Sequence, residues 1–122
     1  MKSAPGVLII DDDTSVQSIL SSALADNYAV QVASTGEEGL RHYEQVRPDV
    51  VLLDVMLPEM NGYELAESLR NRSDYRDTPL IAVTGYTEYD DRGRSLRAGF
   101  NAHITKPINP SHLLDVISEL LD

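Results

Sequence analysis

Residues 50–54 read Val50-Val51-Leu52-Leu53-Asp54, four apolar residues followed directly by an acid. A short run that is apolar throughout is typical of a strand at the centre of a parallel sheet, where helices cover both faces. Similar short runs lie on either side of it, so that five of them together span residues 7–10, 29–33, 50–53, 80–83 and 102–104. The run at 29–33 alternates in polarity, which is typical of an edge strand.

The segments between these runs carry apolar residues at helical spacing. One stripe comprises Val16, Ile19, Leu20, Ala23 and Leu24, and a second comprises Leu113, Ile117, Leu120 and Leu121. Residues typical of helix N-termini precede these segments. Three pairs match or approximate a capping box, namely Thr14 with Gln17, Thr35 with Glu38, and Asn61 with Glu64. Asn109 is a cap residue followed by Pro110 at the first helical position. The segment 87–98 is mostly charged and contains Gly93, so we expect it to be the weakest and most mobile helix.

Five strand–helix units in a row predict the α/β fold class, as a single doubly wound (βα)5 domain whose five-stranded parallel sheet has helices on both faces. The length of 122 residues suits one such domain. The sequence has no cysteine, which excludes disulfides and thiolate metal sites. Because no apolar run is long enough for a bilayer and no signal core follows Met1, we expect a cytoplasmic protein.

The charge of the chain argues against several kinds of partner. Ten basic and twenty acidic residues give a formal net charge of −10. Such a surface repels phosphate backbones, so we expect no direct binding to nucleic acid or to an anionic membrane. The only lysines are Lys2 and Lys106, and the interior one therefore stands out.

Polar residues follow four of the five predicted strands, as Asp11-Asp12-Asp13, Asp54, Thr84 and Lys106. In parallel α/β sheets, ligands bind beyond the carboxyl ends of the strands, so these side chains are expected to meet there. Two carboxylates about 4 Å apart repel each other by about 4 kcal/mol at an effective dielectric constant of 20. Gathering them therefore indicates a bound cation, and an all-oxygen ligand set favours Mg²⁺.

Simpler explanations exist for some of these residues. Asp13, together with Thr14, is more plausibly a helix cap than a ligand. Thr84 suits a strand by its β-propensity alone, although its hydroxyl is also placed to donate to a phosphoryl oxygen. Lys106 is poorly explained as a solvated surface lysine, because Ile104 precedes it on a strand and Pro107 follows it. We expect it to pair with Asp54 or with a phosphoryl group on Asp54.

Six motifs in order resemble the receiver domain of bacterial two-component response regulators, and the resemblance covers essentially the whole chain. They are Val7-Leu8-Ile9-Ile10-Asp11-Asp12-Asp13, Leu53-Asp54-Val55-Met56-Leu57-Pro58, Asn61-Gly62, Val83-Thr84-Gly85, Ala98-Gly99 and Lys106-Pro107. The resemblance implies a flavodoxin-like sheet in the order 2-1-3-4-5. It also implies a cis peptide bond between Lys106 and Pro107.

The resemblance further implies a phosphorelay switch rather than an enzyme that turns over an external substrate. Asp54 would accept a phosphoryl group from phosphohistidine on a sensor histidine kinase or a histidine phosphotransfer protein. Mg²⁺ would be held by Asp12, by Asp11 partly through water, by Asp54 and by the backbone carbonyl of Met56. Lys106 and the Thr84 hydroxyl would complete the cradle around the phosphoryl group, in which the ion neutralises the phosphoryl oxygens.

The output implied by the resemblance is conformational. Thr84 would turn toward the phosphoryl group, and residue 103 would fill the vacated space, changing the face formed by a helix at about 89–98, a strand at 101–105 and the C-terminal helix. That residue is His103 where the family most often has Tyr or Phe, so the response is expected to depend on pH unless His103 is a plain strand-edge histidine. Met56 and Tyr86 flank the path of a hydrolytic water, so we expect slow self-dephosphorylation.

Other families fit the residues less well. A haloacid dehalogenase-type phosphatase also begins with an Asp-x-Asp motif, but it expects Thr or Val where Ser15 stands, and it gives Asp54 no role. A flavin- or nucleotide-binding module would need a glycine-rich loop where three aspartates stand. A receiver that works without phosphorylation is disfavoured because no expected site residue is missing.

The sequence leaves the setting of this domain open. We expect residues 1–122 to form the receiver domain with no output domain, acting on a downstream protein target as a monomer or as a dimer when phosphorylated. A receiver excised from a hybrid sensor kinase would have almost the same sequence. The segment Val83-Thr84-Gly85-Tyr86-Thr87 resembles the receivers of those kinases.

Overall fold

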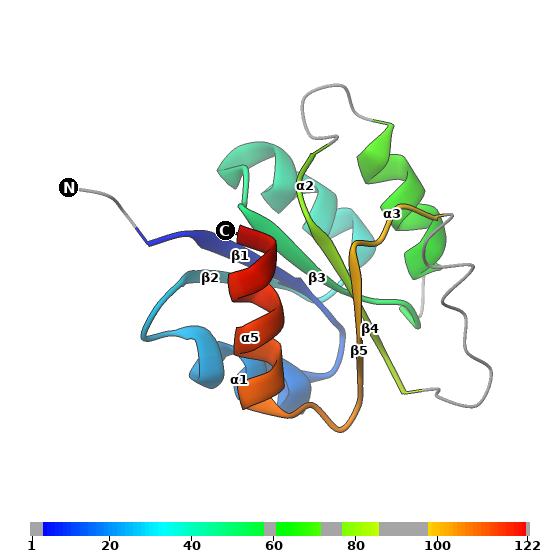
Figure 1. Cartoon of the computed structure of the whole chain (residues 1–122). Helices are drawn as coiled ribbons and strands as arrows, with labels where there is room; N and C mark the ends of the chain where they lie inside the picture. The colour runs from blue at the N-terminus through cyan, green and yellow to red at the C-terminus, as the bar shows by residue number, and fades with distance from the viewer. Residues whose placement is uncertain (1–3, 58–60, 72–76, 86–97, 122) are drawn as a thin grey trace.

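The computed structural model of the chain describes residues 4–57, 61–71, 77–85 and 98–121 (Figure 1). Each of the five apolar runs forms a strand, and these are β1 (Gly6–Ile10), β2 (Ala29–Ala33), β3 (Val50–Asp54), β4 (Leu80–Thr84) and β5 (Ala102–Thr105). All neighbouring strands pair in parallel. Their order is β2-β1-β3-β4-β5, which confirms the predicted sheet.

Four helices lie in the described residues, namely α1 (Thr14–Leu24), α2 (Gly36–Val46), α3 (Gly62–Arg70) and α5 (Pro110–Leu121). The predicted helix over 87–98, and its expected mobility, fall almost wholly outside the described residues. The predicted caps Thr35, Asn61 and Asn109 each accept backbone N–H bonds in the first turn of a helix. None of the helices in the described ranges has the length and apolar content needed to cross a membrane.

The cap of α1 differs in detail from the predicted box. Its N-cap residue is Asp13, whose carboxylate accepts the N–H groups of Ser15 and Val16 at 2.8 and 3.3 Å. The prediction that Asp13 caps this helix is therefore confirmed, whereas Thr14 is already the first helical residue. Gln17 consequently lies one residue beyond the position of a capping-box partner of Asp13 and bonds elsewhere.

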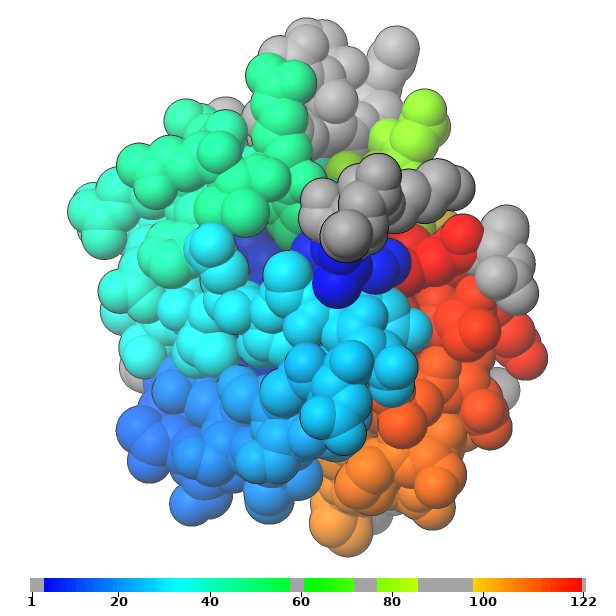
Figure 2. Space-filling model, turned by 90° about the vertical axis from the view of Figure 1, so that its left-hand side faces the viewer, coloured from blue at the N-terminus to red at the C-terminus, as the bar shows by residue number. Residues whose placement is uncertain are grey.

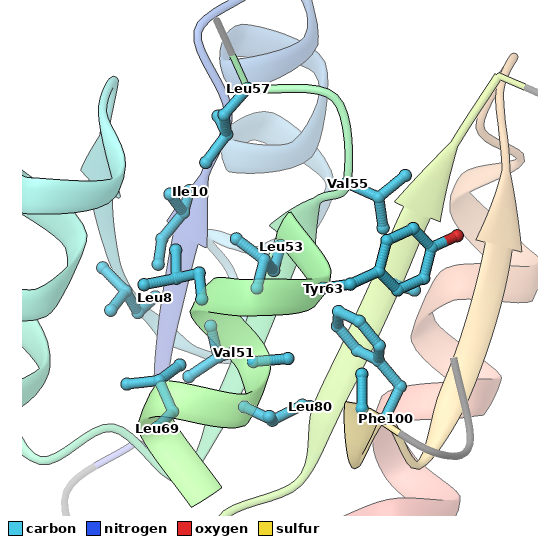
Figure 3. Close-up of a cluster of buried hydrophobic side chains, with 14 of the residues drawn as sticks. Leu8, Ile10, Val51, Leu53, Val55, Leu57, Tyr63, Leu69, Leu80 and Phe100 are labelled. Carbon is cyan, nitrogen blue, oxygen red and sulfur yellow. The ribbon is translucent and has the colours of Figure 1, made fainter. Parts of the chain in front are cut away.

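The helices cover the two faces of the sheet as a doubly wound fold requires. Alternate residues of each strand point to opposite faces, so β1 sends Leu8 and Ile10 toward α2 and α3, but Val7 and Ile9 toward α1 and α5. Figure 3 shows the first cluster, in which the ring of Tyr63 on α3 meets that of Phe100 edge to face. Figure 2, viewed from the side of β2, shows α2 and α5 on opposite sides of that strand.

The strands differ in burial as their sequences predict. All five residues of β3 are buried, which agrees with a central strand, whereas β2 at the edge alternates between exposed and partly buried residues. The predicted apolar stripe of α1 is wrong at Ile19, which is 51% exposed, because α1 meets the core through the buried Leu20 and Leu24 and the partly buried Val16. The peptide bond between Lys106 and Pro107 is cis, as predicted.

Candidate functional site

Four strands end at one edge of the sheet, and each brings a polar side chain there. Asp54 and Thr84 are the last residues of β3 and β4, while Asp11 and Lys106 directly follow β1 and β5. The parallel register keeps them level, because Asp54 pairs with Val83 and the N–H of Lys106 donates to the carbonyl of Thr84 at 2.7 Å. Residues from positions 11 to 106 are thus gathered by the strand order alone.

Three carboxylates come together at this edge. One oxygen from each of Asp11, Asp12 and Asp54 lies within 4.8 Å of the other two. Asp11 and Asp54 are buried, at 1% and 5% exposure, whereas Asp12 is exposed. Two buried acids and one at the surface form a pocket of negative charge that opens to solvent.

Lys106 is the cation that faces the buried pair. Its Nζ donates to Oδ2 of Asp54 at 3.3 Å and forms an ion pair with Oδ2 of Asp11 at the same distance. Burial by itself lowers the pKa of Lys106, but the two carboxylates outweigh burial, so the pKa lies above its ordinary value. Lys106 is therefore charged at neutral pH, and the predicted pairing with Asp54 is confirmed.

The two carboxylate oxygens of Asp11 have different partners. Its Oδ1 accepts the N–H of Asp13 at 2.9 Å, while its Oδ2 is buried and accepts no hydrogen bond of good geometry from the described residues. Burial, and then the charge of Asp54, raise the pKa of Asp11 above its ordinary value although the bond from Asp13 and the charge of Lys106 lower it. A buried carboxylate oxygen that has an ion pair but no hydrogen bond is well suited to bind a cation.

The loop after Asp54 is shaped around that residue. Oδ1 of Asp54 accepts the N–H of Met56 at 2.8 Å, which fixes the carboxylate from the side opposite Lys106. The N–H of Gly62 donates to the carbonyl of Val55, and a Cβ on Gly62 would lie 2.4 Å from the Cα of Val55. Only glycine fits there, so the Asn61-Gly62 motif serves to fold the chain tightly against the loop that follows Asp54.

The other predicted residues lie around this centre. Thr84 is buried, and a Cβ added to Gly85 beside it would meet no atom of the described residues within 4 Å. Met56 is 57% exposed next to Asp54. His103 is partly buried on β5, where it pairs with Ala82. Tyr86, the other residue predicted to flank a hydrolytic water, lies outside the described residues.

Gln17 is a residue of this region that the sequence analysis assigned only to a capping box. Its side-chain amide donates to the backbone carbonyl of Asp11 at 2.5 Å and to Oγ of Ser34 at 3.0 Å. The second partner follows β2 and is 17 residues away, so only the parallel pairing of β1 and β2 brings it near. A local capping pattern gives no signal for such a contact.

The residues present fit a hard divalent cation. The ligands are all carboxylate oxygens, one of them buried without a hydrogen bond from the described residues, and they lie close enough to share an ion. Mg²⁺ prefers such oxygen ligands and usually keeps several waters, which the exposed side at Asp12 permits. The pocket therefore suits chemistry in which a cation and Lys106 together face an anionic group next to Asp54.

A family model described as the response regulator receiver domain matches residues 7–118. The chain belongs to the response regulator receiver domain family. Receiver domains are signalling switches of two-component systems rather than classical enzymes, and they receive phosphoryl groups from histidine kinases. The matched range includes Asp11, Asp12 and Asp13, the residues for which a haloacid dehalogenase and a nucleotide-binding module were considered. The match identifies the domain as a receiver and not as either of these alternatives.

Curated relatives of this receiver domain differ in length. A 14.6 kDa uncharacterized protein of Leptolyngbya boryana is 36% identical over 93% of this chain and 87% of its own length. The probable transcriptional regulator ycf27 of Guillardia theta is 39% identical over 88% of this chain but only 41% of its own length. The chain thus spans less than half the length of the longer relative.

Solved receiver structures match the fold closely. The CheY-like response regulator receiver domain protein of Methanospirillum hungatei is 38% identical, with a TM-score of 0.90 over 98% of this chain and 95% of its own. The receiver domain of sensor histidine kinase PA1611 from Pseudomonas aeruginosa, whose active site cleft coordinates a magnesium ion, is 27% identical, with a TM-score of 0.89 over 98% of both chains.

Proposed function

We propose that this receiver domain, residues 1–122, is a phosphorylation-activated switch in which Asp54 accepts the phosphoryl group. The donor would be a phosphohistidine on a sensor histidine kinase or a histidine phosphotransfer protein. A carboxylate oxygen of Asp54 would form the new O–P bond, while the P–N bond breaks and its electron pair stays on the departing imidazole. The imidazole then takes a proton from water.

One observation carries this proposal. A buried carboxylate at the end of the central strand is faced by a lysine at 3.3 Å and flanked by two more carboxylates within 4.8 Å. A structural ion pair would need no additional acids, and these raise the electrostatic cost of the pocket. A site built to hold a cation and a phosphoryl group explains both the surplus of acids and the lysine.

Mg²⁺ is the cation that we propose for the pocket. Asp11, Asp12 and Asp54 would supply carboxylate oxygens, Asp11 in part through water, and the backbone carbonyl of Met56 would supply another ligand. When bound, the ion offsets negative charge on the phosphoryl oxygens, which is most of what such a transfer requires. The magnesium in the cleft of the PA1611 receiver supports this proposal.

Lys106 and Thr84 would act on the phosphoryl group once it is on Asp54. The ammonium of Lys106 already lies against Asp54 Oδ2 and needs only a small movement to pair with a phosphoryl oxygen instead. The hydroxyl of Thr84, at the end of the adjacent strand, would donate to another of these oxygens. Each group thus stabilises charge that is absent before the transfer.

The output that we propose is a change in the surface around β5. As Thr84 turns toward the phosphoryl group, His103 would follow it inward and alter the face made by residues 89–98, β5 and α5, where a downstream protein binds. The similarity to the PA1611 receiver keeps a second candidate open, in which this domain is the receiver of a hybrid sensor kinase. The chemistry at Asp54 would be the same in both.

The test uses a small acyl phosphate and intact-mass measurement. Wild-type protein incubated with acetyl phosphate and Mg²⁺ should gain one phosphoryl group, and none when EDTA replaces the metal. Asp54→Asn should gain nothing under either condition, while Asp13→Asn, whose side chain caps α1, should still be phosphorylated. A phosphoryl adduct on the Asp54 variant, or none on the wild type, would reject the proposal.

A further inference from the structure

The two backbone carbonyls that flank Asp12 are both held by Gln17. The side-chain amide of Gln17 donates to the carbonyl of Asp11 at 2.5 Å, and its backbone N–H donates to the carbonyl of Asp13 at 3.0 Å. Because a carbonyl oxygen only accepts, the nitrogen of the amide must face Asp11. The second of these bonds belongs to the helix, but the first one depends on the identity of residue 17.

The amide of Gln17 is itself aimed by a second contact. It also donates to Oγ of Ser34, at 3.0 Å. Ser34 is fixed in turn, since its N–H donates to the carboxylate of Glu38 at 2.8 Å, next to the Thr35 cap of α2. Gln17 therefore joins the loop after β1 to the loop after β2 through a rigid partner.

Asp12 depends on this arrangement more than its neighbours do. Asp11 and Asp54 each have a carboxylate oxygen held by a backbone N–H. Within the described ranges the carboxylate of Asp12 takes part in no hydrogen bond or ion pair, and it is exposed. Its place among the three carboxylates is consequently set by the backbone on either side of it.

We propose that Gln17 is a positioning residue for the metal pocket, which fixes the Asp11–Asp12 peptide so that the Asp12 carboxylate meets the cation. This inference rests on the proposed Mg²⁺ site. If the amide is lost, the peptide can rotate, and Asp12 must be ordered again each time an ion binds. The cost falls on the affinity for the ion, while Lys106 and Asp54 stay in place.

The test compares two glutamine-to-methionine substitutions of nearly equal shape. Gln17→Met removes both side-chain hydrogen bonds, and Gln31→Met is the matched control, because Gln31 on β2 loses only its bond to His42. Mg²⁺ dissociation constants are measured by calorimetry on the whole chain. Initial rates of phosphorylation by acetyl phosphate are measured across Mg²⁺ concentrations, and stability by urea unfolding in EDTA.

For Gln17→Met we expect the dissociation constant for Mg²⁺ to rise about fivefold, the effect of one lost hydrogen bond. The Mg²⁺ concentration for half-maximal phosphorylation should rise equally, while the rate at saturating Mg²⁺ stays within about twofold of wild type. Gln31→Met should change neither. Unchanged Mg²⁺ affinity in Gln17→Met, whatever its loss of stability, would show a purely structural role and overturn the proposal.

A variant that leaves Gln17 in place guards against a folding defect. Ser34→Ala removes the contact that aims the amide, and we expect a smaller increase in the Mg²⁺ dissociation constant, about twofold. If Gln17→Met does not fold, an unchanged constant in Ser34→Ala overturns the proposal. Failure of Asp54 to take up phosphate would reject the proposed function, whereas a wild type that binds no Mg²⁺ would reject both.

Discussion

Replacing Lys106 by methionine tests how the charges of this pocket balance. At 3.3 Å two unit charges attract by about 5 kcal/mol at an effective dielectric constant of 20, and Lys106 makes two such contacts. Once it is gone, the carboxylates of Asp11 and Asp54, within 4.8 Å of each other, repel by at least about 3.5 kcal/mol on the same scale. These gross values exceed the net effect, because the free ammonium is hydrated.

The exposed fraction of the Lys106 side chain gives a narrower range for the net loss of stability. Removing one partner of a buried ion pair typically costs about 3–5 kcal/mol. Because the Lys106 side chain is 26% exposed, its ion pairs are partly screened by water, and the cost is lower. We therefore expect the free energy of unfolding of Lys106→Met to fall by about 2–3 kcal/mol at pH 7 without metal. The assay is urea unfolding in EDTA, followed by circular dichroism. Arg41→Met, which removes an exposed cation on α2, should change stability by less than about 0.5 kcal/mol.

The dependence on pH provides a second check. The pKa of Asp11 is already raised in the folded protein, and removing Lys106 raises it further. A raised carboxyl pKa means that the charge costs stability above the native pKa, and that this cost disappears as the pH falls toward the unfolded value of 3.8. The gap between wild type and Lys106→Met should therefore narrow on acidification. A variant as stable as wild type at pH 7, or a gap that widens toward acid, would refute this reasoning.

Four further predictions, one of them with a control substitution, test separate parts of the molecule. Asp11→Asn should stabilise the metal-free protein at pH 7, and urea unfolding should show this gain vanishing toward pH 3.8, because the raised pKa of Asp11 lies above that value. Gly62→Ala should lower the free energy of unfolding by about 2 kcal/mol or more, since its Cβ would lie 2.4 Å from backbone, whereas Gly85→Ala, with open space, should not. Tyr86→Glu should speed the decay of the phosphorylated protein, measured by intact mass; equal decay rates would contradict slow self-dephosphorylation. His103→Phe should remove any difference in affinity of the phosphorylated protein for its partner between pH 6 and pH 8, and equal wild-type affinities would count against a pH-dependent switch.

The strands could be predicted from the sequence because a fully apolar run leaves little choice. The predicted run at 50–53 and the observed β3 differ by one residue, Asp54, which continues the strand pairing. The same holds for Thr84 at the end of β4. Both polar residues thus belong to the paired part of the sheet, which explains why hydrophobicity alone places the strand ends one residue early.

The convergence of the site could not be predicted from periodicity. That Asp11 and Asp54 lie together requires β1 to be next to β3, and the order of strands came from the resemblance and not from the apolar pattern. The buried face of α1 was also predicted only in part, because the predicted apolar stripe included Ile19, which is exposed. Gln17 was missed because its partner Ser34 is distant in sequence.

The electrostatic cost of the pocket is itself part of the mechanism that we propose. Folding places Asp11 where burial and the charge of Asp54 oppose its ionisation, and one lysine offsets only part of that cost. The two apolar clusters on opposite faces of the sheet stabilise the fold enough to offset this electrostatic cost. A cation then binds with a larger gain than it would in a neutral pocket, and phosphorylation of Asp54 changes the same balance of charge. In this proposal, the charge of the pocket would act through Lys106 and Thr84, at the ends of β5 and β4, on the surface that those strands support.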